Sequence, residues 1–202
     1  MNPTDMQAVR ETLQKFQDGY DRRDTSLLTD FRELFVPEDE MEVIGTGAID
    51  PGDGEWCLGP EAACAMVQND WEGWGDLALD VADARIHVLG DAAWLATTGT
   101  VTMDLEPDDT YKDYLAYIQQ VAEDESSDAR TKLIEILRGG TNTLFEGERG
   151  KQYIWPLRFT AVLVRRPASN GSRGSSSGDG RWLFHQIQVS FATTRFPDVR
   201  TV

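Results

Sequence analysis

The sequence is poor in the residues that build disulfide frameworks and metal sites. It has only two cysteines, Cys57 and Cys64, and only two histidines, His87 and His185. Two thiols without a nearby histidine pair make neither a disulfide framework nor a zinc site. Neither histidine has the helical spacing of a local metal motif. We therefore expect reduced cysteines, no metal site and no cofactor.

The chain is also short of positive charge and of long apolar runs. Its 19 Lys and Arg residues stand against 35 Asp and Glu residues, which gives a formal net charge of −16. Such a chain repels nucleic-acid phosphates and anionic membrane surfaces at long range. No stretch approaches the roughly 18 apolar residues of a membrane span, and the first residues do not form a signal peptide. We predict a cytoplasmic protein that binds neither nucleic acid nor membranes.

The residues that are present are sufficient for one folded domain over 1–202, because 40% of them are hydrophobic. Helical spacing of apolar residues predicts a first helix with its apolar side from Met6 to Tyr20. A second helix is predicted after a Thr25 cap, and a third begins at Gly59-Pro60 and ends at Gly73. Strand patterns are found over 40–45 and 55–58, before the third helix, and over 77–89 and 92–105, after it.

The segment 106–150 is acidic at its start but keeps helical spacing through Tyr114, Ile118, Ile134 and Leu137. We predict a helical hairpin inserted between two strands, packed over one edge or mouth of the sheet to bury these side chains. The acidic run could instead gather a cation. A solvated helix face is favoured, because side chains on such a face point apart.

The last part of the chain predicts an antiparallel hairpin. Its arms, 153–165 and 181–191, are rich in β-branched and aromatic residues, and the Ser/Gly segment 168–180 is predicted to be a flexible loop. Alternation places Arg158 and Thr160 on one face of the first arm, and Gln188 and Ser190 on one face of the second. These four residues form a polar line in an apolar ribbon and are a candidate site.

Four segments, in this order and spacing, resemble the SnoaL-like branch of the nuclear transport factor 2-like superfamily. They are Gly54-Glu55-Trp56 followed by Gly59-Pro60-Glu61-Ala62, then Gly90-Asp91-Ala92-Ala93-Trp94, Arg158-Phe159-Thr160-Ala161-Val162-Leu163, and Trp182 leading to Ser190-Phe191. The resemblance implies an α+β, cystatin-like cone, in which a curved antiparallel sheet wraps the N-terminal helix and leaves an apolar pocket. The helical hairpin is then an insertion in that domain.

The resemblance leaves the activity open, since the superfamily includes isomerases, dehydratases, epoxide hydrolases and cyclases alongside non-catalytic domains. Many relatives carry a histidine on the last strand where this chain has Gln188. The tyrosine and aspartate of the ketosteroid isomerases would fall near Phe16 and Ile44. We therefore predict no ketosteroid isomerase activity, and we assign no catalytic residue. Asp21 and Asp24 remain candidate acids, although carboxylates at a helix end more often cap or solvate it.

Two hypotheses follow. The first is a binding protein, or weak enzyme, for a small hydrophobic molecule. Its predicted ligand-binding residues are Trp56, Trp71, Trp74, Met103, Arg158, Thr160, Gln188 and Ser190. We expect Arg158 to be more than half buried and paired with a carboxylate or ligand oxygen, although it could simply pair with Glu42, and the tryptophans could be ordinary core. The second is a non-catalytic homodimer formed through the outer sheet face around Trp94 and Thr98.

Overall fold

The structure is a computed structural model that describes residues 3–52, 54–104, 107–125, 127–147, 152–167, 180–191 and 198–200. The helices are α1 (Pro3–Arg22), the 3-10 helix η1 (Thr25–Leu27), α2 (Leu28–Arg32), α3 (Gly59–Gly73), α4 (Pro107–Glu123) and α5 (Ala129–Gly147). The strands are β1 (Glu42–Ala48), β2 (Gly54–Leu58), β3 (Asp76–Leu79), β4 (Arg85–Leu89), β5 (Ala92–Asp104), β6 (Gln152–Pro167), β7 (Gly180–Phe191) and β8 (Asp198–Arg200). The predicted flexible loop lies outside the described residues except for Gly180.

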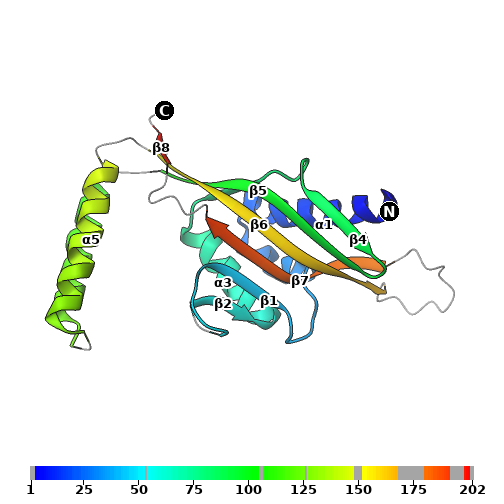
Figure 1. The fold of residues 1–202 in the computed structure, drawn as a ribbon, viewed down its shortest axis with the longest axis horizontal. Coiled ribbons are helices and arrows are strands. Elements are labelled where there is room, and N and C mark those ends of the chain that lie inside the picture. The colour runs from blue at the N-terminus through cyan, green and yellow to red at the C-terminus, as the bar shows by residue number, and fades with distance from the viewer. Residues whose placement is uncertain are drawn as a thin grey trace. The chain divides into compact units, whose positions relative to one another are not determined.

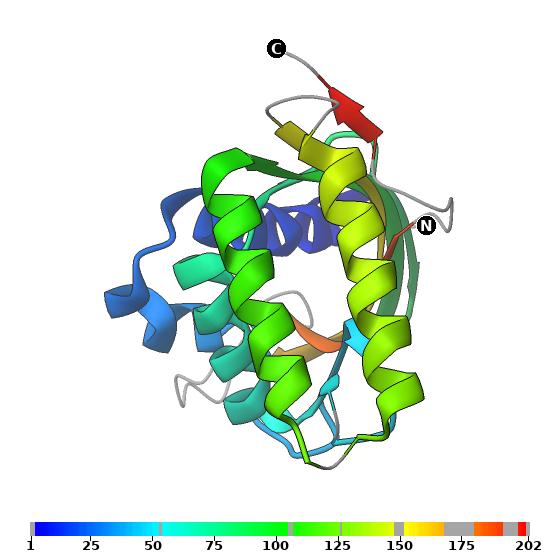
Figure 2. The same ribbon diagram turned by 90° about the vertical axis from the view of Figure 1, so that its left-hand side faces the viewer.

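The chain divides into two compact units, Met1–Val101 with Trp155–Thr193, and Thr102–Ile154 with Thr194–Val202. The second unit contains α4 and α5, which run side by side in Figure 2. The hydroxyl of Tyr114 on α4 donates a hydrogen bond to the carbonyl of Ile136 on α5. The same unit contains β8, which pairs with the beginning of β6.

The strands form one sheet in the order β2-β1-β7-β6-β5-β3, with β4 added to β5 and β8 to β6 (Figure 1). β6 and β7 form the predicted antiparallel hairpin. β1 runs parallel to β7 and antiparallel to β2. Within the first unit the sheet curves over α1. The predicted α+β arrangement, a curved sheet around the N-terminal helix, is confirmed.

The core lies between α1 and the inner face of the sheet. α1 buries Val9, Leu13, Phe16 and Tyr20, which recur at helical spacing and so share one side of the helix. The Phe16 ring lies 5.4 Å from the Phe159 ring and 5.5 Å from the Phe184 ring, centroid to centroid. These contacts join the helix to β6 and β7. Helix α1 therefore packs through the apolar side that the sequence predicts.

The predicted strand over 77–89 is wrong in one respect, because it is two strands, β3 and β4. Between them the Arg10 guanidinium donates hydrogen bonds to the carbonyls of Val81, Ala82 and Ala84. These hydrogen bonds hold the segment between the two strands against α1. The predicted Thr25 cap is also displaced by one residue, since Asp24 accepts from the Ser26 N–H at 3.0 Å.

A β-bulge interrupts the hairpin near the middle of β7. Val162 lies opposite Gln186 and Leu163 lies opposite Phe184, so His185 is the extra residue. Phe184 and Ile187 are both buried although simple alternation would place them on opposite faces. The bulge therefore lets both side chains enter the core.

None of the helices in the described part of the chain has both the length and the apolar character needed to cross a bilayer.

Candidate functional site

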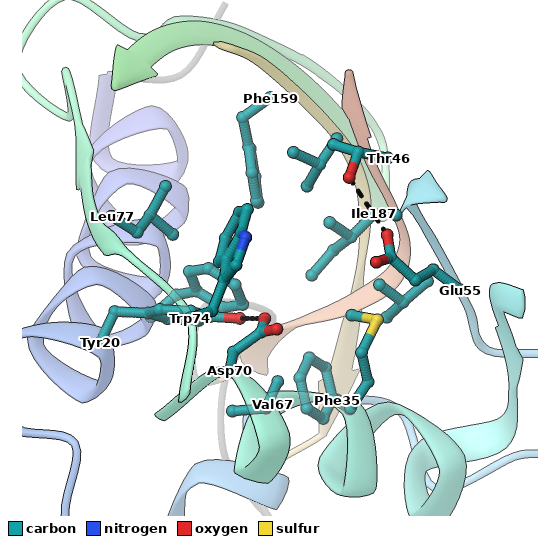
Figure 3. A pocket seen from close by; sticks show the side chains of 15 residues that line it. Tyr20, Phe35, Thr46, Glu55, Val67, Asp70, Trp74, Leu77, Phe159 and Ile187 are labelled. Atoms are coloured by element: carbon teal, nitrogen blue, oxygen red, sulfur yellow. Dashed lines mark hydrogen bonds between the residues drawn. The ribbon is translucent and has the colours of Figure 1, made fainter. Parts of the chain in front are cut away.

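A small cavity lies in the first unit, between α1, α3 and the inner face of β1, β6 and β7 (Figure 3). Its volume is about 40 Å³, which is room for about three water-sized groups. Most of its walls are apolar. The lining residues are Phe16, Tyr20, Phe35, Val43, Gly45, Thr46, Glu55, Met66, Val67, Asp70, Trp74, Leu77, Phe159, Ile187 and Val189.

A tyrosine and an aspartate meet at the wall of this cavity. The hydroxyl of Tyr20, near the end of α1, donates a hydrogen bond to Oδ2 of Asp70 in α3 at 2.8 Å. Tyr20 is buried and Asp70 is half-buried. Asp70 follows Met66 and Val67 by one helical turn, so it continues the inward side of α3. The packing of two helices thus places a carboxyl group in an apolar environment.

The surroundings shift the pKa values of both groups. Burial, and to a smaller extent the neighbouring Glu55, raises the pKa of Asp70 to about 6, although the hydrogen bond from Tyr20 and the charge of Arg23 act in the other direction. Burial and the Asp70 carboxylate raise the pKa of Tyr20 well above its ordinary value. Near neutral pH, Asp70 can therefore gain or lose a proton, whereas Tyr20 remains a donor.

Glu55 on β2 supplies a second carboxyl group to the cavity. Its Oε2 accepts hydrogen bonds from the Gly47 N–H at 2.7 Å and from the Thr46 hydroxyl at 3.3 Å. A side chain at Gly45 would clash, because its Cβ would lie 2.4 Å from the same oxygen. Glycine at that position of β1 therefore makes the space that Glu55 occupies.

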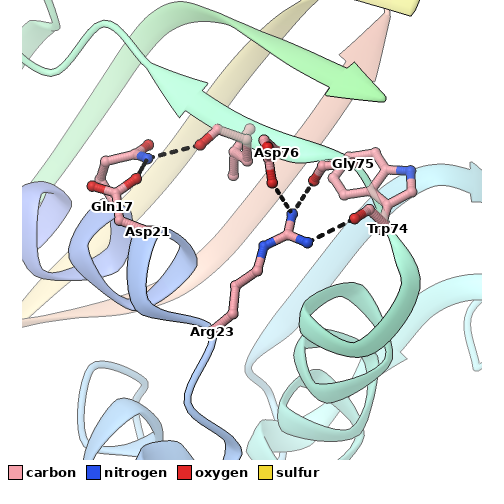
Figure 4. Close-up of polar contacts among 7 residues, drawn as sticks. Gln17, Asp21, Arg23, Trp74, Gly75 and Asp76 are labelled. Atoms are coloured by element: carbon pink, nitrogen blue, oxygen red, sulfur yellow. Dashed lines mark hydrogen bonds and ion pairs between the residues drawn. The ribbon is translucent and has the colours of Figure 1, made fainter. Parts of the chain in front are cut away.

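Arg23 positions the part of the cavity wall that carries Trp74 (Figure 4). It ends α1 with φ of 49°, a left-handed conformation that turns the chain away from the helix. Its guanidinium donates to the Trp74 carbonyl at 2.8 Å and to the Gly75 carbonyl, and it pairs with Asp76 at 3.2 Å. The Arg23 guanidinium thus contacts the segment that joins α3 to β3.

Gln17 holds the next strand to the same helix. Its Nε2 donates to the Leu77 carbonyl at 2.8 Å, and its Oε1 accepts from the Leu79 N–H at 2.8 Å. The amide also donates to Asp21 at 2.7 Å (Figure 4). Gln17 is buried and its two backbone partners belong to β3, so its hydrogen bonds fix β3 against α1.

The structure corrects the predicted ligand-binding face. The register pairs Arg158 with Ser190 and Thr160 with Gln188, so the predicted polar line exists. It lies on the outer face of the sheet, however, because the alternating neighbours Phe159, Ile187 and Val189 line the cavity. None of the four residues of the line contributes to the cavity wall.

The expectation that Arg158 is mostly buried is wrong. Its side chain is exposed, and Nη2 donates to the Phe191 carbonyl at 2.8 Å. Thr160 and Gln188 beside it are also exposed. On this face solvent can satisfy the guanidinium, so the chain has no need to bury a partner for it.

Among the predicted apolar ligand contacts, Trp74 alone lines the cavity. Trp71 is buried in the aromatic core, 5.1 Å from the Phe31 ring. Trp56 lies opposite Ile44 in the β1–β2 ladder, on the other side from the cavity-lining Val43. Met103 belongs to the second unit. Trp56, Trp71 and Met103 are therefore corrected to positions outside this cavity.

Sequence reasoning missed three polar residues that line the cavity, Tyr20, Asp70 and Glu55. The helical pattern places Tyr20 on the apolar side of the first helix, the family resemblance includes Glu55 without giving it a role, and no motif includes Asp70. Asp70 had a detectable signal, because a carboxylate interrupts the apolar stripe of α3. Glu55 had none, since the space at Gly45 that admits it appears only when β1 and β2 are paired. The candidate acids Asp21 and Asp24 do not line the cavity.

Both cysteines are free and half-buried, and the Cys57 thiol lies 3.8 Å from the Met66 sulfur. Burial raises the pKa of each thiol. Within the described ranges, no three His, Cys, Asp or Glu side chains come together as a metal site requires.

No protein-family model and no curated protein matches the sequence. Solved structures do match its fold. One is a proposed dehydratase of the NTF2-like family from Streptomyces avermitilis, 14% identical, with a TM-score of 0.56 over 96% of this chain and 100% of that one.

Two further matches have different descriptions. A ketosteroid isomerase-like protein from Erwinia carotovora atroseptica is 10% identical, with a TM-score of 0.53 over 96% of this chain and 100% of that one. The CaMKII hub of S. rosetta is 12% identical, with a TM-score of 0.50 over 95% and 98%. Similarity at such low sequence identity supports a shared fold but does not assign an activity. The chain therefore has the cystatin-like α+β fold of the nuclear transport factor 2-like proteins.

Proposed function

We propose that the protein binds a small molecule in the cavity and transfers a proton to or from it through Asp70. The observation that carries this proposal is a half-buried carboxyl group, hydrogen-bonded to Tyr20, on the wall of an apolar cavity. A general acid or base works best when its pKa lies near the working pH, and that of Asp70 is about 6. Two proteins of similar fold are described as a proposed dehydratase and as ketosteroid isomerase-like. Dehydration and isomerisation are reactions in which a proton is transferred.

The neighbouring residues have separate tasks in this proposal. Tyr20 donates to Asp70 and so orients the carboxyl group, as a positioning residue. Phe159, Trp74 and Leu77 are apolar walls that keep water from competing with the ligand. Asp70 is the group that would exchange a proton with the ligand.

The test is hydrogen–deuterium exchange at carbon. A panel of small ketones is incubated with the protein in D₂O, and the loss of the protons next to the carbonyl is followed by NMR. We expect exchange above the buffer rate, rising with pH as Asp70 ionises near pH 6. Asp70→Asn should lower the rate by about 100-fold, in line with the usual contribution of a general base.

The matched control is Glu72→Gln, which removes a carboxylate from an exposed position of the same helix. This variant should keep the full exchange rate. Equal rates in wild type and in a folded Asp70→Asn variant would contradict the proposal, as would the absence of exchange in every ketone tested.

A second candidate function, self-association through the outer face of the sheet, is supported by an exposed tryptophan. Trp94 on β5 is 47% exposed and stacks on His87 of β4 at 5.4 Å between ring centroids. Its exposed neighbours along β5, Ala96 and Thr98, are uncharged. In a chain of net charge −16, such a surface lets two copies approach without opposing carboxylates.

Sedimentation velocity tests this second proposal. Trp94→Glu should convert a dimer into a monomer, because it introduces a carboxylate on each side of a two-fold contact. Ala62→Glu, which adds the same charge at an exposed position of α3, should leave the dimer unchanged. A monomeric wild-type protein at 100-fold dilution and at high concentration alike would contradict self-association.

A further inference from the structure

The charged groups of the cavity wall all have the same sign. Asp70 and Glu55 are carboxyl groups, and no Lys, Arg or His is among the described residues that line the cavity. Arg23 acts on Asp70 electrostatically, but its guanidinium contacts the Trp74 and Gly75 carbonyls and Asp76. Any positive charge inside the cavity therefore has to come from the ligand.

The charge of Glu55 destabilises the charged form of Asp70. Glu55 is one of the influences that oppose ionisation of Asp70, together with burial. A half-buried carboxylate is costly when no cation contacts it, and an anionic ligand would add a third negative charge to the same space. A cation bound in the cavity beside Asp70 would offset the cost of ionising this residue. The electrostatics thus disfavour anionic ligands and favour cationic ones.

The rest of the wall suits a cation that also has apolar surface. Five aromatic residues line the cavity, namely Phe16, Tyr20, Phe35, Trp74 and Phe159. Figure 3 shows the Trp74 and Phe159 rings in the same space as the Asp70 and Glu55 carboxyl groups. Aromatic faces attract ammonium groups, and aromatic surfaces are the usual recognition elements for methylated ammonium ions.

We infer that the ligand of this cavity is a small organic cation, a protonated amine or a methylated ammonium ion. This inference rests on the proposed ligand-binding function and names the ligand class. The cavity volume of about 40 Å³ admits about three water-sized groups, so the enclosed part of the ligand has only a few non-hydrogen atoms. With such a cation bound, Asp70 is held as a carboxylate.

The experiment compares ligands of similar size and different charge. Propylammonium, trimethylammonium, 1-propanol and propionate are titrated into ¹⁵N-labelled protein at pH 7.5 in 150 mM NaCl, and the Trp74 indole and Gly47 amide signals are followed. We expect both cations to bind at least tenfold more tightly than 1-propanol, and propionate to produce no shift. Affinity for the cations should rise as the pH is raised from 5 to 7.5, because Asp70, whose pKa is about 6, ionises over this range.

Variants distinguish binding of the cation in the cavity from nonspecific binding to the acidic surface. Asp70→Asn and Glu55→Gln should each weaken propylammonium binding at least tenfold, whereas Glu72→Gln should leave it unchanged. If one of the first two variants fails to fold, the other carries the test. Propylammonium should also lower the pKa of Asp70 in the wild-type protein, which carboxyl ¹³C NMR measures directly.

The outcomes distinguish this inference from the proposed function. Binding of 1-propanol as tightly as propylammonium overturns the cationic class but leaves the cavity as a binding site. Cation binding that is unchanged in both Asp70→Asn and Glu55→Gln overturns the inference, because the cation then binds elsewhere on the acidic surface. Failure of all four probes to shift the cavity signals overturns the inference. The proposed function is tested separately, by the exchange assay.

Discussion

The two faces of β6 and β7 place polar groups in opposite situations. On the outer face, Arg158, Thr160 and Gln188 form a line that is exposed to solvent, which satisfies their hydrogen bonds. The inner face lines the cavity, where Tyr20 of α1 donates a hydrogen bond to Asp70 of α3 among apolar side chains, and burial raises the pKa of both residues. A row of polar residues on a strand therefore identifies a face, but the surroundings of a single carboxyl group decide where proton chemistry is possible.

The largest expected effect on stability comes from one of two adjacent residues of β6. Phe159→Ala should lower the free energy of unfolding by about 3–5 kcal/mol, because Phe159 is fully buried and its removal leaves a cavity. Thr160→Ala, on the exposed side, should change it by less than about 0.5 kcal/mol. Urea denaturation measures both. Similar losses for the two variants would show that the faces do not differ in burial as described.

A second test concerns the support of the inner side. Gln17→Ala should cost about 2–3 kcal/mol, because the Leu77 carbonyl and the Leu79 N–H in β3 lose their buried partner. Gln14→Ala removes an exposed hydrogen bond to Asp18 on the same helix and should cost less than about 0.5 kcal/mol. Thermal and urea unfolding of the pair would show whether the buried amide stabilises β3.

The third test uses pH. The pKa of Asp70 in the folded protein, about 6, exceeds the ordinary value of 3.8. Between these values Asp70 binds more protons in the folded protein than in the unfolded chain, so its contribution to stability falls as the pH rises from about 4 to 6. Asp70→Asn should remove this part of the pH dependence. At pH 7 the variant should be more stable than wild type by about 1–2 kcal/mol, with allowance for partial exposure of the carboxyl group.

Urea denaturation from pH 4 to pH 8 measures this difference. Glu72→Gln, at an exposed position of the same helix, should keep the wild-type pH dependence. If Asp70→Asn retained the wild-type slope between pH 4 and 6, Asp70 would not be the desolvated carboxyl group.

The smallest expected effect is that of Tyr20→Phe. The hydrogen bond from Tyr20 favours the Asp70 carboxylate, so its loss should raise the pKa of Asp70 further above its ordinary value. The free energy of unfolding should fall by about 1 kcal/mol. Carboxyl ¹³C NMR gives the pKa directly, and Tyr117→Phe, in the second unit, should not alter it. A lower pKa of Asp70 in Tyr20→Phe would reverse the assignment of donor and acceptor.

Local patterns in the sequence determined most of the secondary structure. The period of apolar residues located α1 and α3, and the two helices α4 and α5 fall within the acidic segment read as a helical hairpin. The pairing of β6 with β7 followed from two β-rich arms around a Ser/Gly segment, and alternation placed Arg158, Thr160, Gln188 and Ser190 on one common face. These features depend on residues that are neighbours in the chain, so periodicity reports them.

Only the tertiary structure decided which face is the inner one and what chemistry it carries. Alternation sorts a strand into two faces but does not say which of them curves over the helix. The hydrogen bond between Tyr20 and Asp70 joins residues 50 positions apart, and it exists because the fold brings α1 and α3 to the same cavity. The bulge at His185 and the space at Gly45 for Glu55 depend on strand pairing. Desolvation of Asp70 is a property of the folded core as a whole, which is why composition and spacing alone do not reveal it.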